Sequence, residues 1–197
     1  MKLILVRHGE TIENVKGIIQ GHLPGKLTKK GIEQAKKIAL RLKDEKIEYI
    51  YSSDLARASD TTKKIAKFHP NIPIEFTNDL RERNCGEHQG KNKKEIKWAK
   101  EGDFKNYIEP KKGETRTEIC SRAKRFYDHI IKKHKEKTIL LVGHGGINTA
   151  LVSVIIGKTF IDVLKMGEMK NTCITIFEIN KDKNHKIHLF NCTKHID

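Results

Sequence analysis

Two short strand patterns, each with four consecutive apolar residues, constrain the fold more than any other feature: Lys2 to Val6 and Thr138 to Val142. Strands with such an unbroken apolar pattern are typical of a sheet that is covered on both faces. Along the rest of the chain, strand patterns alternate with amphipathic helix patterns, which favours a mostly parallel sheet between two layers of helices. We therefore expect an α/β protein.

Helices and strands can be placed along the whole chain from local patterns. Thr28 is a good N-cap for a helix whose apolar residues recur at helical spacing from Ile32 to Leu42. The region from about 78 to 112 is polar and irregular, with one helix expected near 93–100, so we expect it to be an excursion from the sheet. The expected strands are 2–6, 47–51, 74–76, 138–142, 172–178 and 186–191, and the further helices are 55–68, 114–134 and 146–156.

The length of 197 residues predicts a single domain over 1–197, with the excursion at about 78–112 as an insertion. No stretch approaches the roughly 18 apolar residues of a membrane helix, and Arg7 interrupts the apolar N-terminus too early for a signal peptide. The protein is therefore expected to be soluble and cytoplasmic, with no membrane partner. The four cysteines are widely spaced, which favours reduced thiols over a zinc site or a disulfide framework: Cys85, Cys120, Cys173 and Cys192.

Forty Lys and Arg against 25 Asp and Glu give a net charge of +15, which attracts phosphorylated metabolites and nucleic acid alike. Much of the excess is lysine on helix-like segments, where a solvated helix face is the ordinary interpretation. A nucleic-acid-binding module would need aromatic platforms or a recognition helix, and aromatic residues make up only 6% of this chain. Nucleic acid is therefore not the expected partner.

The strongest functional signal is that two strands end alike, in Arg7-His8-Gly9 and in Gly143-His144-Gly145. Ligands of an open parallel sheet bind beyond the carboxyl ends of its strands, so neighbouring strands would place both imidazoles on one floor. Glycine after each histidine lets the backbone approach a ligand closely, and the helix that Gly145 opens favours an anion.

A metal site fits this pattern poorly, because two imidazoles need further ligands and Arg7 would repel a cation. Arg7 suits a phosphate dianion instead, since its guanidinium can give two charge-assisted hydrogen bonds. Arg57 is a second candidate, although its spacing alone favours an exposed helix arginine.

These residues resemble the histidine phosphatase superfamily, also called the phosphoglycerate-mutase-like superfamily. The resemblance covers essentially the whole chain, in blocks that occur in the family's order: Leu5 to Thr11 with Asn14, Gln20-Gly21, Leu27 to Ala35, Ser52 to Ala58, Leu80 to Arg83, Gly113 to Thr115, Gly143 to Gly145 and Asn171. It implies a three-layer α/β/α sandwich with a mostly parallel central sheet and a small helical insertion over the active site.

By this resemblance, His8 is the nucleophile that becomes phosphorylated, and Glu82 is the proton donor. Arg7, Arg57 and His144 surround the phosphoryl group, and His144 is expected to be protonated beside the phosphate. We expect a backbone carbonyl of the following loop to hold the other ring N–H of His8. Glu10 is a rival acid on sequence alone. The further substrate-binding residues are Asn14, Gln20, Gly21, Arg83 and Gly145, and neither a metal nor a cofactor is expected.

The resemblance is to both phosphatases and cofactor-dependent phosphoglycerate mutases. The mutases are longer and enclose the substrate with paired arginines in the insertion, whereas this chain has no arginine between Asn92 and Lys112. We therefore expect a metal-independent phosphomonoesterase for small phosphorylated metabolites of the sugar phosphate or phosphoglycerate type, most similar to short members of the fructose-2,6-bisphosphatase, α-ribazole phosphatase or broad-specificity type.

Two alternatives stay open at this point, a mutase and a basic nucleic-acid-binding or scaffold protein. A scaffold that had lost catalysis should have lost one of the five phosphate-pocket residues, and none is substituted. Cys85 and Thr149 depart from residues common in relatives, which leaves the substrate open. The oligomeric state is open as well, with a homodimer as one option.

Overall fold

A computed structural model describes residues 1–96, 109–180 and 184–196. Its centre is a six-stranded sheet in the order β3-β2-β4-β1-β5-β6. The four strands from β3 to β1 are parallel, β5 is antiparallel to β1, and β6 is antiparallel to β5. The strands are β1 Lys2–Arg7, β2 Tyr49–Ser53, β3 Ile74–Thr77, β4 Thr138–Gly143, β5 Ile174–Glu178 and β6 Lys186–Cys192.

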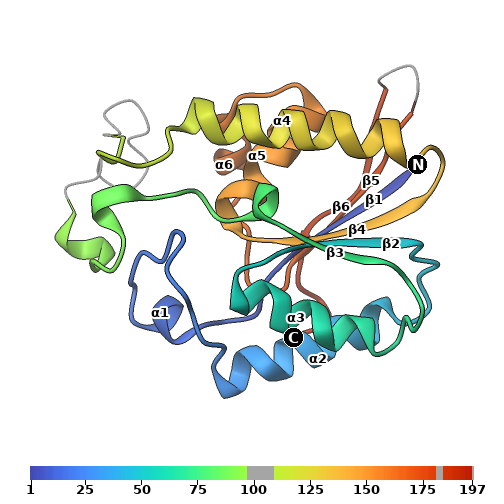
Figure 1. The fold of residues 1–197 in the computed structure, drawn as a ribbon, viewed down its shortest axis with the longest axis horizontal. Coiled ribbons are helices and arrows are strands. Elements are labelled where there is room, and N and C mark those ends of the chain that lie inside the picture. Colours follow the sequence, from blue (N-terminus) through green and yellow to red (C-terminus); the bar gives the residue numbers. More distant parts are fainter. Residues whose placement is uncertain (97–108, 181–183, 197) are drawn as a thin grey trace.

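Helices cover both faces of this sheet, and the two layers lie above and below it in Figure 1. The α-helices are α1 Ile12–Val15, α2 Lys29–Leu42, α3 Ala56–Ala66, α4 Arg116–Lys133, α5 Gly145–Ile156 and α6 Phe160–Met166. Three short 3-10 helices are η1 Asn78–Leu80, η2 Gly86–His88 and η3 Lys93–Glu95. The α/β fold with a mostly parallel sheet is confirmed.

The two hydrophobic cores follow from the alternation of side chains along each strand. Leu3 and Leu5 of β1 point into the core under α4 and α5, whereas Ile4 and Val6 point into the core over α2 and α3. Because both faces of β1 are buried, the unbroken apolar pattern of its sequence is explained.

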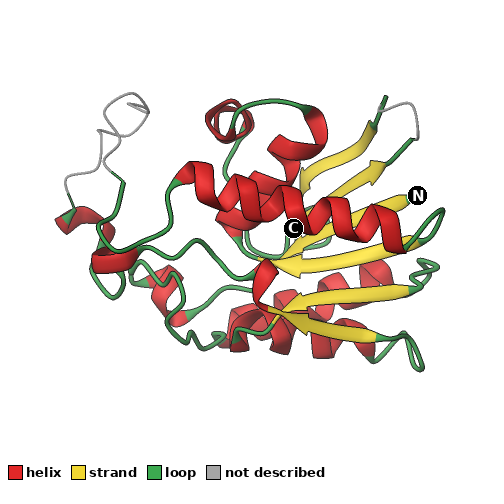
Figure 2. Ribbon diagram, turned by 45° about the horizontal axis from the view of Figure 1, so that its top comes forward, coloured by secondary structure: helices red, strands yellow, loops and turns green. Residues whose placement is uncertain are grey.

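The parallel strands end at one edge of the sheet, which faces the loop that carries α1 and the segment 78–96 (Figure 1). Backbone hydrogen bonds join these two segments: Ile19 donates to Lys91 over 3.0 Å, and Lys93 donates to Gly17 over 2.9 Å. The loop after β1 and the insertion therefore form one connected wall beyond the carboxyl ends of the strands. Figure 2 shows that wall as loops and short helices outside the sheet.

Three local predictions need correction. The loop after β1 contains the four-residue helix α1, which was not expected, although Thr11 and Asn14 form a capping box at its start. Helix α6 was also missed, and it too begins with a capping box. The helix expected at 93–100 is only the three-residue 3-10 helix η3 where the structure describes it, and 97–108 lie outside the described residues. The single-domain prediction and its insertion boundaries stay predictions.

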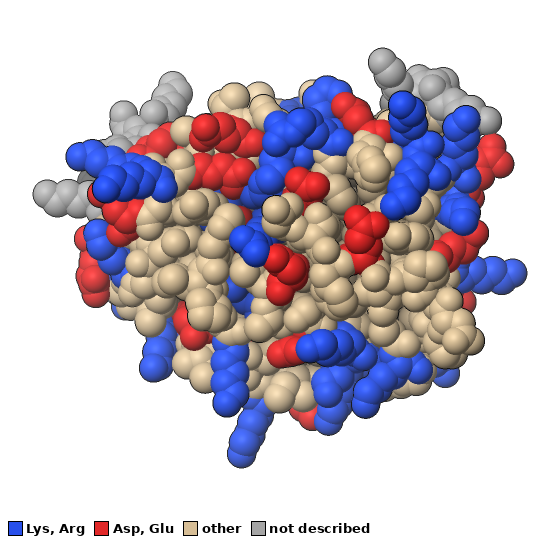
Figure 3. Space-filling view, viewed as in Figure 1, with Lys and Arg blue, Asp and Glu red and all other residues tan. Residues whose placement is uncertain are grey.

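Basic side chains are spread over the molecule. On the face in Figure 3, Lys and Arg occur around the whole outline with Asp and Glu between them. Several exposed lysines on the helices pair with a carboxylate one turn away, as Lys36 does with Glu33 and Lys63 with Asp60. This distribution agrees with the interpretation of the lysines as solvated helix faces.

Candidate active site

The two histidines that follow β1 and β4 lie against each other. Arg7 and Gly143 are partners in the parallel register of these strands, so the next residue of each strand reaches the same place. The ring centroids of His8 and His144 are 5.0 Å apart, and the rings are tilted by 59°. The side chains are almost completely buried. The predicted meeting of the two imidazoles is confirmed.

The ring of His8 is fixed by its neighbour. Its Nδ1 lies 2.7 Å from the carbonyl oxygen of Gly9. Because a carbonyl oxygen only accepts, Nδ1 carries the hydrogen and Nε2 keeps its lone pair when the ring is neutral. Burial holds the pKa of His8 well below its usual 6.5, and the charges of Arg7 and Arg57 lower it further. The free protein therefore presents an uncharged imidazole with an available Nε2.

The glycine after His8 is required by packing. A Cβ atom on Gly9 would lie 2.4 Å from the backbone carbonyl oxygen of Gly31 at the start of α2. The amide of Gly9 also donates to the hydroxyl of Thr61 in α3, over 3.1 Å. The carbonyl that orients His8 is therefore held by two helices of the same layer.

Arg57 lies in the first turn of α3 and is 1% exposed, so the interpretation as an exposed helix arginine is wrong. Its two terminal nitrogens donate to the carbonyl oxygens of Leu23 and Gly21 over 2.9 and 2.8 Å. Burial lowers the pKa of Arg57 to about 10, against a rise due to the carboxylate of Glu82. The guanidinium therefore stays charged at neutral pH inside the protein.

His144 is neutral in the free protein, and its protonation beside a bound phosphate stays a prediction. The Nε hydrogen of Arg57 is donated to Nδ1 of His144 over 3.1 Å, so Nδ1 must be unprotonated. The proton of His144 then sits on Nε2, which lies 2.8 Å from the hydroxyl oxygen of Ser53. Burial keeps the pKa of His144 well below 6.5, and Arg57 lowers it further.

Arg7 has an unused donor at the same place. One terminal nitrogen donates to the carbonyl oxygen of Met169, while its Nε is buried without a hydrogen-bond partner among the described residues. This Nε lies 3.8 Å from the position that a Cβ of Gly145 would occupy, at the start of α5. An anion at the N-terminus of α5 would satisfy the orphaned donor.

Glu82 reaches the same helix start. The backbone amide of Gly146 donates to its two carboxylate oxygens over 2.9 and 3.2 Å. The rival acid Glu10 is engaged elsewhere, since its carboxylate accepts from the hydroxyl of Thr28 at 3.0 Å and pairs with Lys30 at 3.3 Å. The geometry thus favours Glu82 over Glu10 as the acid near the histidines.

Two further predicted residues support this cluster. The side-chain oxygen of Asn14 accepts from the amide of Asn171 over 3.3 Å, and the same amide donates to the carbonyl oxygen of His8 over 3.1 Å. Gly21 contributes its carbonyl oxygen to Arg57. These residues therefore lie beside the histidine pair.

The other two predicted substrate contacts are placed differently. The side-chain oxygen of Gln20 is buried with no hydrogen-bond partner among the described residues. Arg83 was expected to hold an anionic group of the substrate, but it is largely buried and forms an ion pair with Glu109 over 3.1 Å. A substrate anion would have to share Arg83 with that carboxylate.

Sequence reasoning missed Ser53 and His22. Ser53 ends β2, and β2 lies beside β4 in the sheet. The pairing of these two strands was the only available signal that Ser53 lies near His144. The imidazole of His22 donates to the backbone of Glu82 over 2.7 Å, and no sequence pattern connects two residues so far apart.

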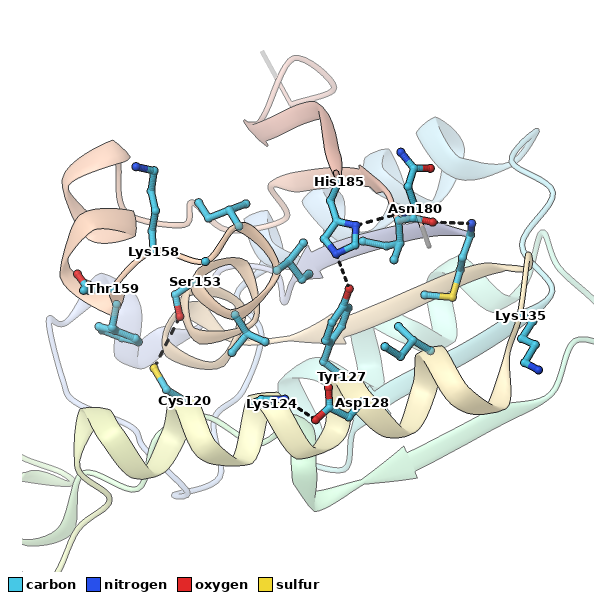
Figure 4. A pocket seen from close by; sticks show the side chains of 18 of the residues that line it. Cys120, Lys124, Tyr127, Asp128, Lys135, Ser153, Lys158, Thr159, Asn180 and His185 are labelled. Carbon is cyan, nitrogen blue, oxygen red and sulfur yellow. Dashed lines mark hydrogen bonds and ion pairs between the residues drawn. The ribbon is translucent and has the colours of Figure 1, made fainter. Parts of the chain in front are cut away.

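A second hollow lies at the opposite edge of the sheet, where Met1 enters β1. It is a pocket of about 1070 Å³ between α4, the end of α5 and the loop after β5. Figure 4 shows Tyr127 of α4 pointing to His185, with a hydrogen bond of 3.2 Å, and Cys120 close to Ser153. None of the predicted site residues lines this pocket, so a large pocket volume does not indicate where the histidine site lies.

Two searches of the described residues bear on other functions. No group of three or more His, Cys, Asp or Glu in those residues is arranged to hold a metal ion. No single described helix has the length and apolar character to span a membrane, and only the sharply bent pair of α5 and α6 meets these criteria together.

A mostly parallel sheet that ends in two facing histidines, with two arginines and a helix N-terminus around them, defines an α/β protein whose site suits an anion such as phosphate. Comparison with known families places the chain more closely. Residues 3–193 match the histidine phosphatase superfamily (branch 1), and the chain belongs to this family.

Its relatives include both kinds of enzyme considered above. The chain is 35% identical over 198 residues to a metal-independent phosphoserine phosphatase of Arabidopsis thaliana, covering 92% of this chain and 78% of the relative. It is 32% identical over 192 residues to a 2,3-bisphosphoglycerate-dependent phosphoglycerate mutase of Brucella canis, covering 91% and 93%.

Among solved structures, the fold resembles a phosphoserine phosphatase of Entamoeba histolytica in complex with 3-phosphoglyceric acid. The TM-score is 0.86 at 28% identity, with 99% of this chain and 98% of that chain covered.

Proposed function

We propose that this enzyme of the histidine phosphatase type hydrolyses small phosphomonoesters through a phosphohistidine on His8, without a metal ion. The observation that carries the proposal is the hydrogen bond from Nδ1 of His8 to Gly9, which leaves a lone pair on Nε2 beside two arginines. Phosphoryl transfer needs an in-line nucleophile, neutralisation of the phosphate charge and a proton for the leaving oxygen.

In the first step, Nε2 of His8 attacks phosphorus and the bond to the ester oxygen breaks. Glu82, in its protonated form, gives its proton to the departing alkoxide. In the second step, water attacks the phosphohistidine, Glu82 takes a proton from that water, and the P–N bond breaks to release phosphate. His8 and Glu82 are thereby restored to their starting forms.

Positive charge for both steps comes from the chain itself. Arg57 is held rigidly by its three hydrogen bonds, and Arg7 keeps an unused Nε donor. The N-terminus of α5 adds backbone amides that suit an anion. Preorganised donors of this kind stabilise the charge of the transition state without reorganisation.

The proposed substrates are small phosphate esters, with phosphoserine and phosphoglycerates as the first to test. The named relatives support this range, since one is a phosphoserine phosphatase and a solved neighbour holds 3-phosphoglyceric acid. The absence of arginine between Asn92 and Lys112 in the sequence favours hydrolysis over a mutase reaction. A cytoplasmic location and a homodimer stay predictions.

The test is a substrate panel assayed with purified protein in EDTA: phosphoserine, 3-phosphoglycerate with and without 2,3-bisphosphoglycerate, a sugar phosphate and p-nitrophenyl phosphate. Release of inorganic phosphate is expected, together with an acid-labile, base-stable phosphoenzyme that disappears in His8→Asn. A strict metal requirement, or phosphoenzyme that survives in His8→Asn, would overturn the proposal. Formation of 2-phosphoglycerate as the main product would identify a mutase instead.

A further inference from the structure

One three-residue segment, Gly21-His22-Leu23, contacts both Arg57 and Glu82. The carbonyl oxygens on either side of His22 accept from the guanidinium of Arg57, at 2.8 Å for Gly21 and 2.9 Å for Leu23. The imidazole of His22 reaches Glu82 instead, with its Nε2 at 2.7 Å from the backbone carbonyl oxygen. The segment thus connects the buried cation to the residue that carries the acid.

The direction of the hydrogen bond between His22 and Glu82 is defined. A carbonyl oxygen only accepts, so Nε2 of His22 carries the hydrogen. Burial lowers the pKa of His22 below 6.5, and the nearby charges of Arg122 and Arg81 lower it further against the effect of that hydrogen bond. At neutral pH the imidazole is therefore an uncharged donor to Glu82.

The backbone of this segment is itself clamped. The amide of His22 donates to the side-chain oxygen of Gln89 over 2.7 Å, and the same oxygen accepts from the amide of Cys85 over 3.4 Å. Gly21 has a positive φ of 50°, and a Cβ there would lie 2.1 Å from the Gln89 oxygen. The imidazole of His22 therefore extends from a fixed support.

We infer that His22 is a positioning residue for Glu82, an inference that rests on the proposed role of Glu82 as the acid. The carboxylate of Glu82 is fixed at one end by the amide of Gly146, and the backbone that carries it is fixed by His22. Arg122 gives the same carbonyl a longer contact of 3.5 Å, so His22 is the closer donor. A displacement of a catalytic group by about 1 Å can cost on the order of 10²-fold in rate.

The test exploits the dependence of proton donation on the leaving group. An alkyl phosphate such as phosphoserine needs a proton on its departing oxygen, whereas p-nitrophenolate hardly does. We expect His22→Ala to lower kcat for phosphoserine by about 10- to 100-fold and to change kcat for p-nitrophenyl phosphate by no more than about threefold. His22→Gln can place an amide donor near the position of Nε2 and should recover most of the lost rate.

The control is His69→Ala. His69 is also a buried histidine of lowered pKa, but its imidazole contacts the backbone of Leu42 at the end of α2. We expect its removal to leave the ratio of the two rates unchanged, whatever its effect on stability. Equal losses on both substrates in His22→Ala, unrecovered by His22→Gln, would overturn the inference.

Glu82→Gln separates this inference from the proposed function. If Glu82→Gln loses activity selectively on phosphoserine, the acid assignment stands, and the effect of His22→Ala should be largely absent in the Glu82→Gln background. If His22→Ala costs the same factor in both backgrounds, only the inference about His22 fails. If Glu82→Gln shows no leaving-group selectivity, the assignment of the acid fails first.

Discussion

Arg57 donates a hydrogen bond to the unprotonated Nδ1 of His144 across 3.1 Å, and both side chains are buried. This bond shows that the positive charge of the pair lies on Arg57 and that His144 is neutral in the free protein. The second histidine of the site is then oriented from two sides, by Arg57 and by Ser53. In the free protein, the positive charge at this place therefore comes from the arginines.

The first prediction concerns the geometry of Arg57. Arg57→Lys keeps a positive charge but cannot reach His144, Gly21 and Leu23 together, so buried acceptors lose their donors. We expect kcat/KM to fall by about 10²- to 10³-fold and the free energy of unfolding to fall by about 1–3 kcal/mol. Steady-state kinetics and urea unfolding measure the two effects. Arg41→Lys, on the exposed face of α2, is the control. Wild-type activity in Arg57→Lys would show that charge alone suffices.

The second prediction tests the orientation of His144. Ser53→Ala removes the oxygen that accepts from Nε2 of His144, and the buried N–H loses its partner. The free energy of unfolding should fall by about 1–2 kcal/mol, and the less well oriented imidazole should lower kcat/KM by roughly tenfold. Ser59→Ala, which removes a hydroxyl from a partly exposed face of α3, should behave as wild type in the same assay. An unchanged kcat/KM in Ser53→Ala would mean that Arg57 alone orients the ring.

The sequence was sufficient for the sheet and for the position of the two histidines. Buried strands such as Lys2–Arg7 have an apolar pattern that neither solvent-exposed strands nor loops share, and parallel strands end at one edge. The strand order therefore determines which residues at the strand ends are neighbours, which is why the proximity of His8 and His144 could be predicted.

Burial and protonation could not be predicted in the same way, because they depend on contacts between distant loops. Arg57 is buried because the carbonyls of Gly21 and Leu23 approach it. The spacing of apolar residues along α3 does not indicate these contacts. The neutral state of His144 in the free protein follows from its hydrogen bond with Arg57, which the spacing does not indicate either. Arg83 meets Glu109 across 26 positions of the chain, so its ion pair was also hidden.

The third prediction follows from the lowered pKa values of the buried histidines. The unfolded chain takes up protons on these residues near pH 6.5, whereas in the folded protein His8 and His144 stay neutral to well below that pH. Stability should therefore be fully present above about pH 6.5 and decrease as the pH falls below it. Urea unfolding between pH 7.5 and pH 5.5 measures this. A protein that becomes more stable on acidification over that range would contradict the assigned shifts.

The same shift makes a prediction for activity. Because the nucleophile must be unprotonated, loss of kcat/KM through protonation of His8 should begin only well below pH 6.5. The reaction of p-nitrophenyl phosphate depends little on the proton donor Glu82. A pH profile measured with this substrate therefore isolates the loss of kcat/KM that is caused by protonation of His8. An acidic limb of kcat/KM centred near pH 6.5 would contradict the lowered pKa of His8.

The last prediction uses the contact between Gly146 and Glu82. A Cβ atom on Gly146 would lie 2.4 Å from a carboxylate oxygen of Glu82, whereas its other close neighbours are 3.4 Å away or more. The end of a flexible side chain can move at little cost, so Gly146→Ala should displace the carboxylate and leave the fold intact. Alanine in the first turn of α5 also has the better helix propensity, by up to about 1 kcal/mol.

We therefore expect Gly146→Ala to keep or slightly raise the melting temperature while it lowers kcat for phosphoserine by at least about tenfold, since a displaced acid is a misaligned one. The rate with p-nitrophenyl phosphate should change much less, because its leaving oxygen needs little protonation. The comparison of the two rates distinguishes a displaced proton donor from a damaged phosphate pocket, because a damaged pocket would lower kcat for both substrates equally. Full activity of Gly146→Ala on phosphoserine would show that the observed position of the Glu82 carboxylate is not the one used in catalysis.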